Sequence, residues 1–112
     1  MKKLYLLFVI VLIIVSIASA NTIHVPGDHR TIQAGVLASH DGDTVLVANG
    51  RYTGFGNRGI DFQGREIVII AENGPENCII DLENLTNYAA LFVHSGEGSN
   101  SVFSGFKIVN SS

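Results

Sequence analysis

Residues 41–50, DGDTVLVANG, decide the fold of this chain. An Asp-Gly-Asp turn precedes the apolar run 44–48, and the turn pair Asn49-Gly50 follows it. Strands that are apolar along their whole length, rather than alternating, are typical of parallel sheets that are buried on both faces. The stretch therefore predicts a buried strand, stacked in parallel with its neighbours.

The same pattern returns further along the chain. Residues 66–74 read EIVIIAENG, so that Asn73 follows its apolar run just as Asn49 does, and Asn110 closes a third run. Asn49 and Asn73 are 24 residues apart, whereas Asn110 comes 37 residues after Asn73, and the polar stretch 82–88 is interpreted as a loop that lengthens this interval. A recurrence of about 20–25 residues is typical of a solenoid, and a β-sandwich is the alternative. Asparagine suits such turns because it tolerates positive φ and its amide can bond along a stack. The other predicted strands span 22–25, 59–62, 78–81, 90–93 and 102–109.

One short helix is predicted over residues 31–38. Thr31 is a suitable N-cap, and Ile32, Val36 and Leu37 share one helical face. Gly35 costs such a helix about 1 kcal/mol relative to alanine. We therefore expect something to pack closely beneath Gly35.

Several stretches resemble the N-terminal section of exported, pectin-lyase-like proteins with a right-handed parallel β-helix. They are 23–28 (IHVPGD), 31–34 (TIQA), 41–47 (DGDTVLV), 50–53 (GRYT), 74–81 (GPENCIID) and 104–110 (SGFKIVN). The resemblance implies an all-β solenoid, a right-handed parallel β-helix of about three coils with a short N-terminal capping helix. The expected units are a signal peptide at 1–20, a strand and capping helix at 21–43, and C-terminally incomplete coils at 44–112.

The beginning of the chain predicts export. Lys2 and Lys3 precede an uncharged, mostly apolar run over 4–17, and residues 18–20 (ASA) fit a signal-peptidase site. An uncleaved anchor is the alternative reading. Without the two lysines the mature chain has five basic and ten acidic residues, a formal charge of −5, which argues against a nucleic-acid partner. The expected location is secreted, periplasmic or at the cell surface.

Candidate site residues follow from residue type and the predicted coils. For catalysis on a sugar polymer, which needs paired carboxylates and a base, the candidates are Asp61, Asp81 and Arg65. For stacking on sugar faces, the candidates are Tyr52, Phe55 and Tyr88. No metal site is predicted, since the four histidines lack ligand spacing, and Cys78 is read as a buried, inert thiol.

The leading hypothesis is that the chain is an exported, non-catalytic β-helix module with a structural or glycan-binding role. One alternative is the N-terminal portion of a polysaccharide lyase or another carbohydrate-active enzyme whose catalytic coils are missing; only this reading would involve calcium. A non-functional gene fragment is the other alternative. The expected partner is a polysaccharide, with no membrane span after signal cleavage. Further coils, or self-association, are expected at the C-terminal end.

Overall fold

The computed structural model describes residues 19–86, 89–92, 98 and 100–111. Within them lie one helix and nine short strands, and every strand pair is parallel. The sheets have the orders β1-β2-β5-β8, β3-β6-β9 and β4-β7. The elements are β1 (Thr22–Val25), α2 (Ile32–Ala38), β2 (Thr44–Val47), β3 (Gly50–Tyr52), β4 (Ile60–Asp61), β5 (Val68–Ala71), β6 (Cys78–Asp81), β7 (Leu91–Phe92), β8 (Val102–Ser104) and β9 (Lys107–Val109).

The predicted parallel pairing is confirmed, and its register builds the core. Val45 pairs with Ile69, and both side chains are 0 % exposed. Every second residue of β2 and of β5 is buried, and the buried residues of the two strands are aligned with each other. Their side chains therefore form continuous apolar rows across the sheet. The predicted asparagine contact is confirmed as well, because Asn73 Nδ2 donates to Asn49 Oδ1 at 2.8 Å.

The predicted fold class is wrong. An all-β solenoid, a right-handed parallel β-helix of about three coils, is not what the structure shows; the chain is a small mixed α/β fold with short parallel sheets and one helix. The pairing does confirm the unequal spacing of the asparagine turns, with a longer interval before the third strand of the series. Thr22 pairs with Thr44, Thr44 with Val68 and Val68 with Val102, and the last of these intervals is much longer than the other two.

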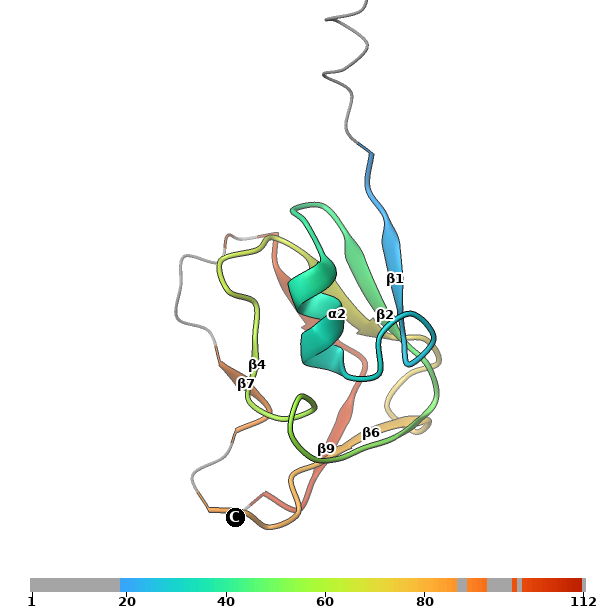
Figure 1. The fold of residues 1–112 in the computed structure, drawn as a ribbon. Helices are drawn as coiled ribbons and strands as arrows, with labels where there is room; N and C mark the ends of the chain where they lie inside the picture. Colours follow the sequence, from blue (N-terminus) through green and yellow to red (C-terminus); the bar gives the residue numbers. More distant parts are fainter. Residues whose placement is uncertain (1–18, 87–88, 93–97, 99, 112) are drawn as a thin grey trace, which may run out of the picture.

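Helix α2 belongs to the core of this fold. It packs against β1, β2 and β4 and lies between the β1–β2 pair and β4 in Figure 1. The predicted N-cap is confirmed, because Thr31 Oγ1 accepts a hydrogen bond from the Ala34 N–H at 3.2 Å. The helix ends where the Ser39 N–H donates to the Val36 carbonyl at 3.0 Å. No described residue belongs to a helix that is long and apolar enough to span a membrane.

The buried face of α2 differs from the predicted one. Ile32, Gly35 and Val36 are buried, whereas Leu37 is 51 % exposed, so the assignment of Leu37 to this face is wrong. The expected packing beneath Gly35 is confirmed. A Cβ there would lie 3.0 Å from a Val25 methyl group and 3.1 Å from a Val45 methyl group. Glycine is therefore the residue that lets the helix approach the sheet.

Two predicted strand boundaries also need correction. The single strand expected over 102–109 is divided into β8 and β9 by Gly105, whose φ is +87° and which lies close to Ala71. The turn expected at Asn49-Gly50 leads directly into β3, a strand outside the predicted set. Both differences arise because sharp corners let the chain pass from one sheet to another within a few residues.

Candidate functional site

Asp61, the first catalytic candidate, lies on β4 and is held by local contacts. Its Oδ1 accepts a hydrogen bond from the Gln63 N–H at 2.8 Å, so the carboxylate folds back over its own turn. The side chain of Gln33 brackets its main chain, donating to the Asp61 carbonyl at 2.9 Å and accepting from its N–H at 2.8 Å. This arrangement ties helix α2 to β4.

Asp81, the second candidate, ends β6 and is 8 % exposed. Its Oδ2 accepts two hydrogen bonds from the Arg51 guanidinium, at 2.8 and 3.1 Å. Its Oδ1 accepts from Asn110 Nδ2 and from the Glu83 N–H, both at 2.8 Å. The Asn110 bond, the Glu83 N–H and Arg51 together hold the pKa of this carboxyl below its ordinary value. Asp81 thus joins β3 and the end of β9 to β6.

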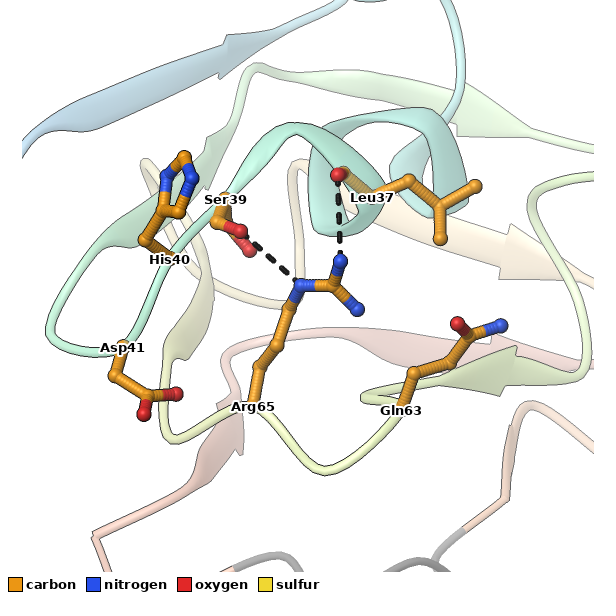
Figure 2. A pocket seen from close by; sticks show the side chains of 6 residues that line it. All are labelled: Leu37, Ser39, His40, Asp41, Gln63 and Arg65. Atoms are coloured by element: carbon orange, nitrogen blue, oxygen red, sulfur yellow. Dashed lines mark hydrogen bonds between the residues drawn. The ribbon is translucent and has the colours of Figure 1, made fainter.

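Arg65, the third candidate, lines an open, largely polar pocket of about 570 Å³ at the C-terminal end of α2. Its Nε donates to the Ser39 carbonyl at 3.1 Å and its Nη2 approaches the Leu37 carbonyl at 3.5 Å (Figure 2). A cation at the carbonyl end of a helix stabilises the helix dipole. The imidazole of His40 and the carboxylate of Asp41 do not converge on the guanidinium in Figure 2.

The structure does not bring the three catalytic candidates together. Asp61 belongs to the β4–β7 sheet and Asp81 belongs to the β3-β6-β9 sheet, whereas Arg65 follows β4 and directs its guanidinium to carbonyls at the end of α2. General acid–base chemistry needs its groups within hydrogen-bond reach of one substrate atom or of one water. In the described part of the chain each of these three side chains is instead bonded into the framework of the fold.

The aromatic candidates divide sharply by exposure. Tyr52 is 8 % exposed, and its hydroxyl donates to the Ala48 carbonyl at 2.8 Å, while burial raises its pKa. Tyr52 is therefore a core residue. Phe55, a little further along the chain, is 95 % exposed. Tyr88 lies outside the described residues.

Phe55 is presented by a well-bonded loop, residues 53–59. Asn57 fixes the loop internally, because its N–H donates to the Gly54 carbonyl at 3.1 Å and its Nδ2 donates to the Thr53 carbonyl at 2.9 Å. The glycines on either side of Phe55 have φ values of +81° and +92°, conformations that other residues rarely adopt.

The loop is also anchored to two separate elements. On the α2 side, the Gln33 N–H donates to the Gly56 carbonyl at 2.9 Å, and the Ile32 N–H donates to Asn57 Oδ1 at 3.0 Å. On the β6 side, the Gly54 N–H donates to Glu83 Oε1 at 3.1 Å. The backbone that carries the exposed ring is thus fixed before any partner arrives.

Glu83 places a polar group beside this loop. Its carboxylate accepts from the Gly54 N–H and lies 3.5 Å from Arg58 Nη1, and its side chain is 46 % exposed. Asn57 and Glu83 were not recognised from the sequence as parts of a site. The signal that could have indicated the loop is the Gly-Phe-Gly triplet at 54–56, an aromatic residue between two glycines.

Potential metal ligands do not gather in the described part of the chain, where no three His, Cys, Asp or Glu side chains form a group. Cys78 is fully buried, as predicted, and its thiol lies 3.7 Å from the Ala48 carbonyl oxygen. Burial raises the pKa of this thiol to about 11. The thiolate, which is the reactive form, is therefore scarce at neutral pH.

We expect the Cys78 thiol to resist a thiol-specific disulfide reagent at pH 8 in the native protein and to react completely in denaturant. The reason is that burial hinders both access of the reagent and ionisation of the thiol. Absorbance of the released thiolate measures the reaction. Full reaction within minutes under native conditions would contradict the burial of Cys78.

A comparison with known proteins found no matching family model, no matching curated protein and no matching solved structure.

Proposed function

We propose that the chain is an exported, non-catalytic surface module that binds carbohydrate through the loop of residues 53–59. The observation that carries this proposal is Phe55, a large apolar side chain that is 95 % exposed on a loop held by hydrogen bonds on both sides. Exposing a whole phenylalanine ring forfeits about 1.5–3 kcal/mol of burial free energy. A rigid loop that keeps such a ring exposed to water is suited to binding a ligand.

The chemistry around Phe55 fits a sugar. The flat ring offers an apolar face to the C–H groups of a pyranose, and the neighbouring Glu83 carboxylate can accept hydrogen bonds from hydroxyl groups. An apolar contact combined with a few fixed polar groups is the usual composition of a small-ligand site. Because the loop is already ordered, binding loses less conformational entropy than it would with a flexible loop.

The charge of the chain favours a neutral polysaccharide. The mature chain carries a formal charge of −5, and Glu83 adds a carboxylate at the proposed site itself. Like charges repel at long range, so polyuronates are disfavoured partners at low ionic strength. Export, the other part of the proposal, is supported by the signal-peptide pattern over residues 1–20.

The Phe55→Ala substitution tests the proposed site. We expect retardation of the native protein in gels containing neutral xylan, β-glucan or galactan, and a loss of affinity of about tenfold or more for the variant, since stacking on one ring contributes on the order of 1.4 kcal/mol. Phe55→Tyr should keep most of the affinity, because it keeps the ring.

Leu37→Ala is the matched control, since Leu37 is an exposed apolar residue outside the loop. Equal binding by the native protein and the Phe55→Ala variant would refute the proposed site, and absence of retardation in all three gels would refute neutral-glycan binding. Polygalacturonate, with and without calcium, should show neither retardation nor a rise in unsaturated-uronide absorbance. Such a rise would favour the lyase alternative.

A further inference from the structure

The junction between Ala20 and Asn21, where the signal sequence is predicted to end, carries the further inference. The Asn21 N–H donates to Asp43 Oδ1 at 2.9 Å, and the Asn21 carbonyl accepts from the Thr44 N–H at 2.9 Å. The main chain of Asn21 is therefore fixed against the turn that precedes β2. Ser19 and Ala20, which come before it, are exposed, so the fold leaves this junction accessible.

Asp43 holds a negative charge at this turn although it is only 3 % exposed. Its Oδ1 accepts from the Asn21 N–H, and its Oδ2 accepts from the His40 N–H at 2.8 Å. These two main-chain donors hold the pKa of the carboxyl below its ordinary value, so the group is ionised at neutral pH. Aspartate is rarely buried to this extent unless its charge is paired.

Among the described residues, no lysine or arginine forms an ion pair with Asp43. The contact of that kind is made by His40, whose Nδ1 lies 3.9 Å from Asp43 Oδ2. The His40 side chain is 89 % exposed, and its imidazole carries a charge only when it is protonated. The two main-chain N–H groups are neutral donors, so the buried charge of Asp43 has no permanent cation beside it.

Cleavage of the signal sequence creates such a cation at the right place. A signal peptidase adds water across the Ala20–Asn21 peptide bond, which leaves a carboxylate on Ala20 and an amino group on Asn21. An α-amino group has an ordinary pKa of about 7.7–8.0, so it takes up a proton and is an ammonium at pH 6.5. The nitrogen that donates to Asp43 as an amide is the one that becomes this ammonium.

We propose that Asp43 is the receptor for the mature N-terminus: after cleavage between Ala20 and Asn21, the Asn21 ammonium forms an ion pair with the Asp43 carboxylate. The inference rests on the export part of the proposed function. Charge-assisted hydrogen bonds are roughly twice as strong as neutral ones, so cleavage strengthens the contact that holds the start of β1 against the turn before β2. The mature domain is therefore more stable than the same domain in the precursor.

Nα-acetylation of the mature chain, residues 21–112, isolates the charge. The acetylated chain keeps an N–H at Asn21 but has no ammonium, and it can be prepared by chemical ligation at Cys78, the single cysteine. We expect the chain with a free amino group to unfold about 3 °C or more above the acetylated chain at pH 6.5 and low ionic strength. Circular dichroism during heating measures both midpoints.

Asp43→Asn should abolish this difference, because the amide has nearly the same shape as the carboxylate but no charge. Asp41→Asn is the matched control, since Asp41 is an exposed aspartate of the same turn. The difference between the free and the acetylated chain should persist in Asp41→Asn. Persistence in Asp43→Asn, or equal midpoints for the two forms of the native sequence, would overturn the proposal.

The reactivity of the α-amino group gives a readout that needs no substitution. An ammonium held by a carboxylate reacts slowly with an acylating reagent, because its lone pair carries a proton. At pH 6.5 the mature chain should react at least tenfold more slowly than a chain that retains Ala20, whose amino group lies one residue earlier. Equal rates would also overturn the proposal.

N-terminal sequencing of the exported chain separates this inference from the proposed function. We expect the sequence to begin at Asn21. Another first residue would refute both the predicted cleavage site and the ion pair, while leaving the binding of glycans to the loop of residues 53–59 open to its own test. Loss of glycan binding would in turn leave the midpoints and reaction rates expected here unchanged.

Discussion

A carboxylate at position 32 is expected to unfold the chain. Ile32 is 0 % exposed and is the first residue of α2, where its N–H donates to Asn57 Oδ1. Ile32→Asp removes a buried apolar side chain and places a charge without a partner against the core. Each change costs several kcal/mol, and together they exceed about 4 kcal/mol, a large part of the stability of a small domain. Circular dichroism during urea titration measures the loss.

Leu37→Asp is the matched control on the same helix. Leu37 is 51 % exposed, so its replacement should cost only about 1–1.5 kcal/mol, from the lower helix propensity of aspartate and its charge at the carbonyl end of the helix. A native-like urea midpoint for Ile32→Asp would contradict the placement of α2 within the core. Equal losses for both variants would mean that the helix buries a different face.

A larger side chain at Gly35 is expected to separate the helix from the sheet. The first added carbon alone would lie 3.0 Å from Val25 and 3.1 Å from Val45, closer than ordinary van der Waals contact. Gly35→Val adds two further methyl groups to this contact, and overpacking of this kind costs about 1–3 kcal/mol. The gain in helix propensity over glycine is only a few tenths of a kcal/mol. The steric overlap is larger than this gain, so Gly35→Val should lower the free energy of unfolding.

Ala38→Val controls for the effect of a branched residue in this helix, because Ala38 is exposed at the last position of α2. Thermal unfolding of Gly35→Val should occur several degrees below that of Ala38→Val. An unchanged or higher midpoint for Gly35→Val would show that the sheet can move away from the helix at little cost.

Features that short sequence patterns mark were predictable from the sequence, including two that join residues far apart in the chain. The N-cap at Thr31, the parallel pairing of the apolar runs and the contact between Asn49 and Asn73 all follow from residue type and short patterns. The fold class was not predictable in the same way. The apolar runs and their asparagine turns suggest a stack of similar coils, whereas the structure has separate short sheets and a helix packed against β1, β2 and β4.

Which of the candidate aromatic residues is exposed was also difficult to predict from the sequence. Tyr52 and Phe55 are aromatic residues close together in the sequence, and the glycines on either side of Phe55 are a weak local signal that distinguishes them. Tyr52 is buried because it pairs with Ile80 in the register of β3 and β6. Phe55 is exposed because its loop bonds to Gln33 and Glu83, which are distant from it in the chain. Long-range pairing decides which of the two rings reaches solvent.

The unequal intervals between paired strands have a consequence for how this protein can vary. In the four-stranded sheet the register stays in phase although the intervals differ, so the additional length lies in the segments between strands. An insertion inside a strand would turn its following side chains to the opposite face. Natural or engineered variants should therefore accept new loops at the corners, giving different surfaces on an unchanged interior.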